Sequence, residues 1–406
     1  MSRRITFLAF IGVFVISLVV LYLNIEVIKV NNLPNDLPIS YSDVEQINQN
    51  KPFGRNITAK IEEKTVSVGG EKSTIKTLIF KLFGFLPIKT IEVNIGDEKE
   101  VFLGGAPIGF SIDIDGLIVL GGNSVLTDKG LVNNFDNSEL KKGDIITAVN
   151  DKKISSVKDL KDFLDNEYVE GESILHINRN GEKITLNVSP IKDQEENKYK
   201  FGLWIRNDAA GVGTLTYVES STLNYGALGH PITDYETGVA IPARSGKIFA
   251  CNVVGLNKGE KGSPGEIKGV FMQGKNSKGT VEKNTPYGVF GKLTEQDIID
   301  KNKSADIGSR LTMKPGKATL ISSISGVNEE YEIEIIKANY QPKSSDKSFV
   351  FRVTDSRLLD LTGGIIQGMS GSPILQNGRV VGAVTHVFVS DPTKGYGVYV
   401  DWMISA

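Results

Sequence analysis

The residues best suited to catalysis lie near the C-terminus, where Ser370 stands between two glycines in Gly368-Met-Ser-Gly-Ser-Pro373. Gly368 and Gly371 let the chain turn tightly, direct backbone N–H groups at a developing oxyanion and leave the serine hydroxyl accessible. This arrangement suits a nucleophilic serine in acyl transfer. A Gly-Ser-Pro turn is also common in ordinary loops, so other residues must decide between chemistry and a structural turn.

A serine hydroxyl is a weak nucleophile and needs a neighbouring base, usually a histidine that a third group orients. The sequence contains three histidines. His176 and His386 lie in apolar runs and fit positions in strands. His230 lies in a glycine-flanked turn, four residues before Asp234. The sequence therefore favours His230 as the base.

The order of these residues separates two classes of hydrolase. In α/β-hydrolases the serine precedes the acid and the histidine, whereas in chymotrypsin-like enzymes the histidine comes well before the serine. His230 precedes Ser370 by 140 residues (370 − 230). The Gly-x-Ser-x-Gly elbow of α/β-hydrolases is also incomplete, because residue 372 is serine. The order predicts a chymotrypsin-like fold.

Several sequence blocks, in order, resemble those of one known family. They are Asp208-Ala-Ala-Gly-Val-Gly-Thr-Leu-Thr216, Tyr225-Gly-Ala-Leu-Gly-His-Pro-Ile-Thr-Asp234, Gly262-Ser-Pro-Gly-Glu266, Arg352-Val-Thr-Asp355, Gly368-Met-Ser-Gly-Ser-Pro373, Ala383-Val-Thr-His-Val387 and Asp391-Pro-Thr-Lys-Gly-Tyr-Gly397. With them, residues from about 100 to 406 resemble the stage IV sporulation protein B family, membrane-anchored serine peptidases of endospore-forming bacteria.

The resemblance implies a catalytic triad of His230, Asp355 and Ser370, with the N–H groups of Gly368 and Ser370 as the oxyanion hole. From the residues alone, Asp234 and Asp355 rank about equally as the acid, and Asp360 is also available. No cofactor is implied, and three scattered histidines predict no metal site.

The resemblance also implies the biological role. The expected substrate is a membrane-associated regulatory protein, and its cleavage leads to activation of a late mother-cell sigma factor. Self-cleavage is expected from the sequence itself, because residues 24 to about 60 look exposed and unpacked, which is where proteolysis concentrates. Two alternatives from other classes are a non-catalytic PDZ adaptor and an HtrA-like quality-control protease, although in the latter the PDZ modules usually follow the peptidase.

Composition restricts the partners and the fold class. The 46 Lys and Arg residues nearly balance the 48 Asp and Glu residues, so the net charge of −2 offers no basic surface for nucleic acid. The 43 glycines and the short β-branched runs favour a mainly β, multidomain protein. The single Cys251 excludes an intramolecular disulfide and is expected to be a small buried residue.

The N-terminal residues predict a membrane anchor. Between Ile5 and Leu23 lie 19 residues without a charge, close to the ~20 that cross a bilayer as a helix. No Ala-x-Ala-like cleavage site follows, which favours an uncleaved anchor over a signal peptide. Arg3 and Arg4 precede the span and should remain cytoplasmic, so the rest of the chain is expected outside. For a sporulation protein this means the space between the forespore and mother-cell membranes, with release by self-cleavage.

Four segments are predicted: a stub and anchor over residues 1–24, a stalk and short β segment over 25–102, a PDZ domain over 103–190 and a serine peptidase over 198–406. Residues 24 to about 60 are polar and contain three prolines, so an extended stalk is expected there. Residues 74–95 predict two strands around a turn at 84–87.

Residues 103–190 resemble a PDZ domain. Ile108, Gly109 and Phe110 match the carboxylate-binding loop, and Ser156 begins a predicted amphipathic helix. A strand edge beside such a loop would bind a peptide, either from a protein target or from the protein's own N-terminal segment.

The remaining apolar runs predict strands of two packed antiparallel β-barrels with the site in their cleft. The glycine-rich residues 259–265 lack the ending of a phosphate loop and are expected to form a structural turn. The predicted strands are 212–218, 238–242, 249–255, 318–322, 331–336 and 349–353.

Overall fold

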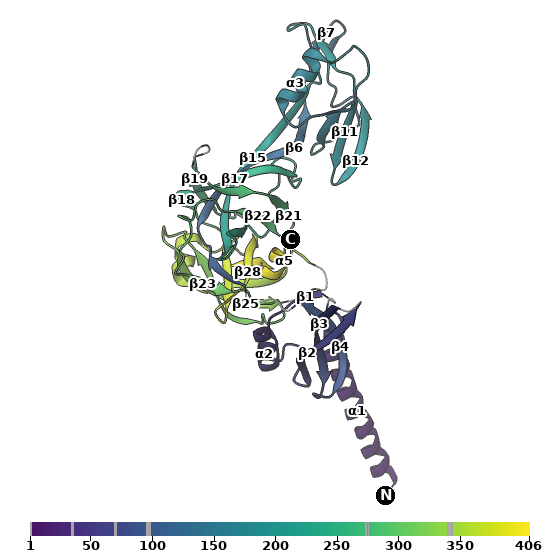
Figure 1. Ribbon diagram of the computed structural model, residues 1–406, viewed down its shortest axis with the longest axis vertical. Helices are drawn as coiled ribbons and strands as arrows, with labels where there is room; N and C mark the ends of the chain where they lie inside the picture. The colour runs from purple at the N-terminus through teal and green to yellow at the C-terminus, as the bar shows by residue number, and fades with distance from the viewer. Residues whose placement is uncertain are drawn as a thin grey trace.

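The structure is a computed structural model that describes residues 2–406, apart from 34–35, 69–70, 95–98, 273, 275, 339–340 and 342–343. The protein is elongated and mainly β, as the composition predicts (Figure 1). A long helix and a small sheet form one end, a module with helix α3 forms the other, and the large β region lies between them.

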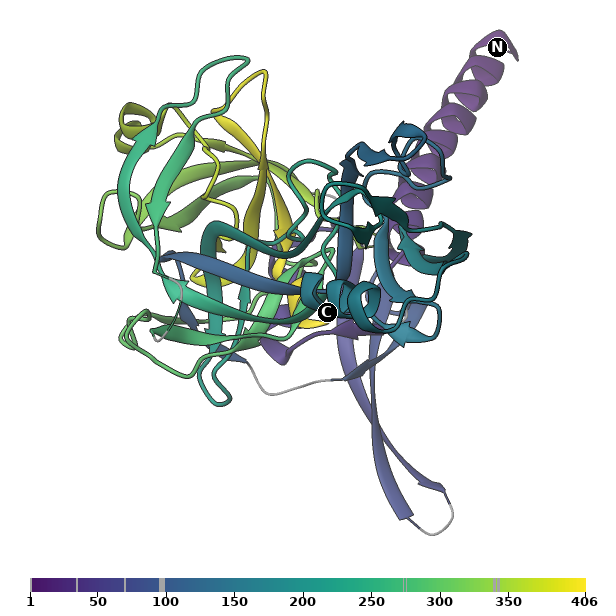
Figure 2. The same cartoon turned by 90° about the horizontal axis from the view of Figure 1, so that it is seen from above.

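The N-terminal part is a folded domain. Its sheet has the order β1-β4-β3-β2, and Leu78, Phe80 and Ile91 are fully buried in its core. Strands β2 and β3 form a long hairpin that projects from the molecule (Figure 2). The elements are α1 (Ser2–Asn31), β1 (Asp36–Pro38), α2 (Tyr41–Asn50), β2 (Ile57–Val68), β3 (Glu71–Leu82) and β4 (Leu86–Asn94).

The prediction of an extended stalk over residues 24 to about 60 is therefore wrong. Helix α1 continues to Asn31, and Ser40 caps α2 in a capping box with Asp43. Val44 and Ile47 of α2 pack into the core of the sheet. This mostly polar segment therefore has an apolar stripe on the face of α2 that contacts the sheet. The predicted strand pair around residues 84–87 is confirmed as β3 and β4.

The module at the far end contains the predicted helix. Ser156 caps α3, accepting a hydrogen bond from the N–H of Asp159, and Leu160 and Phe163 pack inward. The elements are β7 (Val125–Thr127), β8 (Gly130–Val132), β9 (Ile145–Val149), β10 (Lys152–Lys153), α3 (Val157–Asn166), β11 (Ile174–Arg179), β12 (Glu182–Asn187), β13 (Ile191–Asp193) and β14 (Lys198–Lys200).

Two long strands join this module to the central region. Strands β6 (Pro107–Gly122) and β15 (Leu203–Glu219) pair antiparallel over most of their length, and both pass from one region into the other (Figure 1). The two regions consequently share one continuous sheet.

The first half of the central region is an open sheet. The sequence predicts two packed antiparallel β-barrels, and this half is less closed than the other because its strands remain continuous with the α3 module through β6 and β15. Predicted strand 238–242 is also absent: Asp234 organises a turn there, accepting from the N–H of Gly238. The strands of the open sheet in this half are β5 (Glu100–Leu103), β16 (Asn224–Ala227), β17 (Ala243–Ala250), β20 (Ser277–Val281), β21 (Lys283–Thr285), β22 (Gly288–Lys292) and β23 (Ser304–Asp306), and β18 (Asn252–Asn257) and β19 (Glu266–Val270) form a separate two-stranded sheet.

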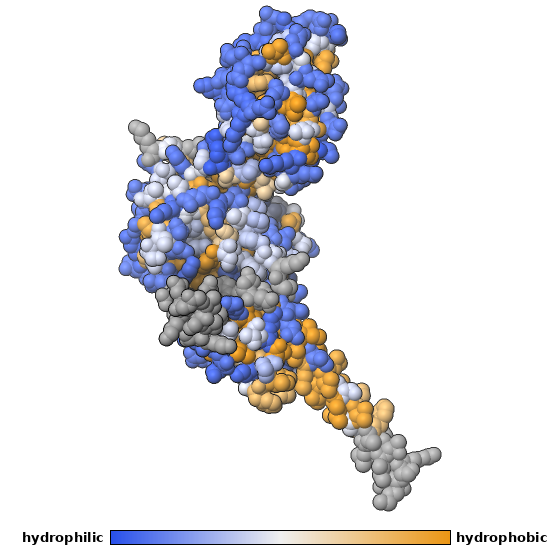
Figure 3. Space-filling model, turned by 45° about the vertical axis from the view of Figure 1, so that its right-hand side comes forward, coloured by the Kyte–Doolittle hydropathy of each residue, from blue (hydrophilic) through white to orange (hydrophobic). Residues whose placement is uncertain are grey.

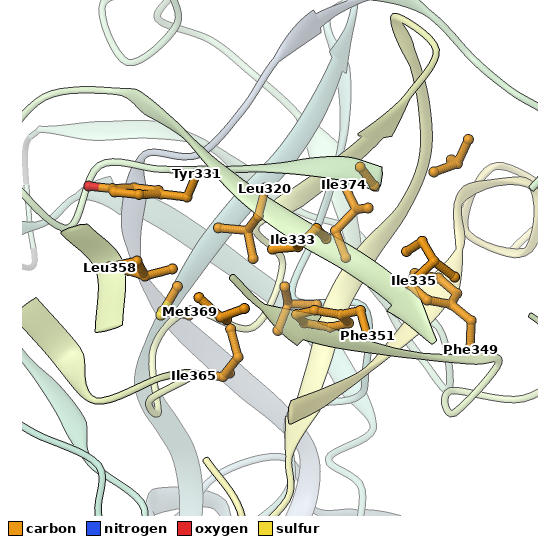
Figure 4. Packing of buried hydrophobic residues seen from close by; sticks show 14 of the residues in the cluster. Leu320, Tyr331, Ile333, Ile335, Phe349, Phe351, Leu358, Ile365, Met369 and Ile374 are labelled. Carbon is orange, nitrogen blue, oxygen red and sulfur yellow. The ribbon is translucent and has the colours of Figure 1, made fainter. Parts of the chain in front are cut away.

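The second half is a closed six-stranded barrel with the order β24-β25-β26-β29-β28-β27, as predicted. Phe349, Phe351, Ile333 and Leu320 fill its interior together with Met369 (Figure 4). The elements are β24 (Gly316–Ser322), β25 (Glu329–Ala338), β26 (Phe349–Val353), α4 (Ser356–Thr362), β27 (Pro373–Gln376), β28 (Arg379–Val387), β29 (Lys394–Tyr399) and α5 (Val400–Ile404).

Candidate active site

The turn that carries Ser370 connects α4 to β27 and requires both of its glycines. Gly368 and Gly371 each have φ of 98°, which disfavours residues with a side chain. A Cβ on Gly371 would lie 2.1 Å from the carbonyl oxygen of Thr214, and one on Gly368 would lie 2.9 Å from Ile267. Met369, next to the serine, is buried in the barrel core (Figure 4). The turn is therefore fixed from both sides.

Thr214 of β15 binds this turn from the opposite half of the region. Its hydroxyl donates to the carbonyl of Gly368 at 2.8 Å, and its N–H donates to the carbonyl of Ser370 at 2.9 Å. The N–H groups of Gly368 and Ser370 have no hydrogen-bond acceptor among the described residues. They are the two donors that the sequence assigns to the oxyanion hole.

The hydroxyl of Ser370 is hydrogen-bonded to strand β28. It donates to the carbonyl oxygen of Thr385 at 2.8 Å. Ser372, two residues on, is fully buried, and its hydroxyl has no hydrogen-bond partner within the described part of the chain. Of the two serines in the motif, only Ser370 is partly exposed.

His230 reaches the same residue of β28 from the first half. Gly229 before it has φ of 71°, and a Cβ there would lie 3.0 Å from the side chain of Thr385. This close approach brings His230 against the end of β28, beside the residue that accepts the hydrogen bond of Ser370. The structure thus brings together two residues that lie 140 positions apart (370 − 230).

The protonation of His230 follows from its surroundings. Its Nδ1 lies 2.8 Å from the carbonyl oxygen of Pro231, which can only accept, so Nδ1 carries the proton and Nε2 is the basic nitrogen. Burial lowers the pKa of His230, while the Pro231 hydrogen bond and the charge of Asp346 act in the opposite direction. At neutral pH the ring is therefore neutral and able to accept a proton.

A second histidine and a carboxylate complete this cluster. The rings of His230 and His386 are 5.2 Å apart between centroids, and Nε2 of His386 lies 3.9 Å from Oδ2 of Asp346. Burial and the neighbouring His230 lower the pKa of His386 to about 4, although Asp346 opposes this shift. His386 occupies a strand, as predicted, but it also belongs to the site. Asp346 lies in the loop before β26, and no motif in the sequence indicates it.

Asp355, the acid that the family resemblance implies, lies elsewhere. It precedes α4 as its N-cap, and its carboxylate accepts hydrogen bonds from Arg357 and from the N–H of Glu332. The guanidinium of Arg357 lowers the pKa of Asp355 to about 2. Asp346 precedes β26 and Asp355 follows it, and five strand residues alone span roughly 17 Å. The structure does not bring Asp355 to His230.

The two other acids considered from the sequence also have structural contacts. Asp234 is buried, pairs with Arg206 at 3.0 Å and accepts hydrogen bonds from its own turn. Asp360 is exposed on α4. The glycine-rich residues 259–265 form a turn, as predicted, and this turn supports the site because Gly265 accepts a hydrogen bond from the N–H of Gln367.

The prediction that Ile108, Gly109 and Phe110 bind a peptide is wrong. They lie within β6, hydrogen-bonded to β15 on one side and β17 on the other. Because both edges of β6 are paired at this position, a peptide cannot add there as a further strand. The side chains of Ile108 and Phe110 are also buried.

A groove occurs instead beside α3. It is a cavity of about 370 Å³ between the helix and residues 198–205, lined by Leu160, Leu164 and Leu203. Gly202, with φ of 66°, makes the turn into β15, whose first residues pair only with β6 among the described strands. A helix, a glycine turn and a strand with one unpaired edge form the arrangement that accepts an extended peptide as an added strand.

A β-rich region in two halves, with a glycine-flanked serine and a neutral histidine meeting between them, defines a serine peptidase. Comparison with known families agrees: residues 197–404 match the SpoIVB peptidase S55 family and residues 123–189 match the PDZ domain. The first match covers half of the chain, and the chain belongs to the SpoIVB peptidase S55 family. It is a sporulation-related serine peptidase with a PDZ domain. No curated protein matches the chain.

The N-terminal helix fits either of two roles. Residues Phe10–Asn31 are long and apolar enough to cross a membrane, a property that membrane anchors share with signal sequences. Its apolar side chains from Phe10 to Tyr22 are exposed in the structure.

Proposed function

We propose that Ser370 is the nucleophile and His230 the general base of this peptidase. The observation that carries the proposal is their meeting at Thr385, where the Ser370 hydroxyl is hydrogen-bonded and the turn before His230 is packed. A rotation about χ1 would break the hydrogen bond to the Thr385 carbonyl and direct the Ser370 hydroxyl towards Nε2 of His230. The state described here is then a resting state of the nucleophile.

The proposed reaction follows the order of acyl transfer. As Ser370 Oγ bonds to the substrate carbonyl carbon, its proton passes to Nε2 of His230 and the carbonyl electrons move onto oxygen. The N–H groups of Gly368 and Ser370 donate to that oxyanion. His230 then protonates the leaving amine as the peptide C–N bond breaks. Water, deprotonated by the same ring, attacks the acyl carbon, and the ring returns that proton to Ser370 Oγ as the ester bond breaks.

Asp346 is the carboxylate that supports this role of His230. The Pro231 carbonyl holds the Nδ1 proton, and the negative charge of Asp346 favours the imidazolium that forms during the reaction. The family resemblance assigns the acid to Asp355 instead. The contacts of Asp355 favour a different contribution, in which it fixes the start of α4 and hence the segment that leads to Ser370.

The remaining parts of the proposal concern the target and the place of action. We propose that α1 anchors the protein, that the peptidase faces the space between the forespore and mother-cell membranes, and that its substrate is a membrane-associated regulatory protein. The groove beside α3 would select a peptide from this target or from the protein's own N-terminal segment. Cleavage would lead to activation of a late mother-cell sigma factor.

Self-cleavage between the anchor and the PDZ domain also belongs to the proposal. Because α2 and β2 to β4 form a packed domain, a cut within these elements requires local opening of that domain. An inactive Ser370→Ala chain, expressed without an active copy, should remain full length.

Covalent labelling tests the catalytic assignment. The full chain in detergent should react with a fluorophosphonate probe, and both Ser370→Ala and His230→Ala should abolish the labelling. Ser372→Ala is the matched control and should be labelled, because the Ser372 hydroxyl is buried. Labelling of Ser370→Ala at the wild-type rate would refute Ser370 as the nucleophile.

A further inference from the structure

The turn between β3 and β4 exposes an unusual concentration of apolar side chains. Phe83, Phe85 and Leu86 are 51%, 74% and 51% exposed, and the rings of the two phenylalanines stack 6.4 Å apart. Val169, by contrast, is an exposed apolar residue without such a neighbour in sequence, which is normal for a protein surface. Three such residues within four positions indicate a contact surface.

This turn is connected to α1 by hydrogen bonds. The N–H of Phe83 donates to the carbonyl of Asn56 at 2.7 Å, and the side-chain amide of Asn56 donates to Glu26 of α1 at 3.3 Å. Glu26 is buried, so its charge does not face the surroundings. The turn therefore lies close to the level of residue 26 along the helix.

The lengths of β4 and α1 give a second estimate of how far along α1 the turn lies. Lys89 of β4 donates to the carbonyl of Asn31 at 2.9 Å, which aligns these two residues. From Lys89 to Phe85 the strand advances about 13 Å, and from Asn31 back to Leu23 the helix advances about 12 Å. Phe85 thus reaches about the level of Leu23.

Leu23 is also where the uncharged span ends. The 19 residues from Ile5 to Leu23 measure about 28 Å as a helix, against about 30 Å for the hydrocarbon core of a bilayer. Leu23, Val27 and Val30 pack against the N-terminal sheet, whereas the large apolar side chains from Phe10 to Tyr22 are exposed. The hydrophobic surface of α1 continues onto the adjoining edge of this domain (Figure 3).

We propose that the turn containing Phe83, Phe85 and Leu86 inserts into the interfacial layer of the same bilayer that α1 crosses. Exposed Phe and Leu side chains at this depth suit insertion at the boundary between the headgroups and the acyl chains. Tyr22 of α1 lies next to Leu23 at the same level, and Arg55, in the turn before β2, is exposed and suits lipid phosphates. This second contact would fix the orientation of the N-terminal domain on the membrane. The inference rests on the proposed anchoring by α1.

Site-specific fluorescence tests this contact with the full chain. Ser370→Ala keeps the chain intact, and Cys251→Ala removes the single native thiol. Into this background Phe85→Cys is introduced and labelled with the environment-sensitive fluorophore NBD, then reconstituted into phosphatidylcholine–phosphatidylglycerol vesicles. Phe14→Cys serves as a probe of the anchor, and Val169→Cys as a probe of an 83% exposed site in the PDZ domain.

In vesicles we expect a blue-shifted emission from the probe at position 85, with stronger quenching by lipids that carry a shallow spin label than by lipids that carry a deep one. The probe at position 14 should be quenched best by the deep label, and the probe at 169 by neither. If the probe at position 14 is inserted but the probe at position 85 emits as in water, α1 crosses the bilayer but the turn does not touch it.

Two further outcomes also contradict the proposal. A blue shift at position 85 that lipid quenchers do not affect, and that grows with protein density, would assign the turn to a second copy of the chain. A probe at position 14 that lipid quenchers do not reach would show that α1 is not inserted, which removes the anchor itself. The two probes therefore separate failure of the anchor from failure of the turn.

Discussion

Asp355→Asn should lower the stability of the C-terminal barrel, and the loss should depend on pH. The Asp355 carboxylate is 7% exposed and is paired with Arg357 at 2.8 Å. The fall of its pKa from 3.8 to about 2 corresponds to ~2.5 kcal/mol at about 1.4 kcal/mol per pKa unit. Because the side chain of Arg357 is 58% exposed, solvent screening reduces this contribution to about 1–2 kcal/mol.

Asparagine should retain the cap of α4, since Asn and Asp are comparable N-caps. Asp355→Ala should cost about 1 kcal/mol more, because it also removes the cap. The depressed pKa gives a stabilisation that is present above the unfolded pKa of about 3.8 and is lost as the pH falls through about 2. The difference between wild type and Asp355→Asn should thus be constant from pH 7 to 5 and should shrink below pH 4.

Urea unfolding followed by Trp402 fluorescence measures this difference within the full chain. Trp402 packs against the barrel, and Trp204→Phe leaves it as the only tryptophan. A stability loss that is the same at pH 7 and pH 3 would refute the ion-pair argument. Complete loss of proteolysis with unchanged stability would place Asp355 in the chemistry, as the family resemblance implies.

Four other changes test the site and its surroundings. Asp346→Asn should lower the pKa of His230 further, since Asp346 raises it, so the acid limb of the kcat/KM profile should move to lower pH; Asp355→Asn should leave that limb in place. Ser372→Ala should keep near-normal turnover and melting temperature, because its buried hydroxyl has no partner among the described residues; a dead variant would contradict this. Leu164→Arg in the groove should impair cleavage of the protein target while a short peptide is cut normally, and equal losses on both would mean that the module supports the fold. Asp43→Ala should cost roughly 3 kcal/mol in urea unfolding, because it removes both the buried 3.2 Å ion pair with Arg379 and the capping-box hydrogen bonds with Ser40, whereas a change under 0.5 kcal/mol would refute these contributions.

The sequence by itself determined the features that depend on neighbouring residues. The glycines around Ser370 and before His230 need unusual φ angles that the residue types reveal, so the turns that carry Ser370 and His230 could both be predicted. Ser156 and the apolar spacing after it specified α3, and the length of the uncharged run specified α1. These are local properties of short segments.

Tertiary structure alone decided the features that depend on contacts between distant segments. Asp346 joins the histidine pair only because the loop before β26 lies beside the end of β28, a contact that no spacing encodes. A short Gly-containing motif fits more than one strand, so the sequence predicts the peptide groove at residues 108–110. Strand pairing on both sides excludes a groove there. Residues 24 to about 60 looked extended because their apolar positions are sparse, and only the sheet β2 to β4 provides the surface that α2 covers.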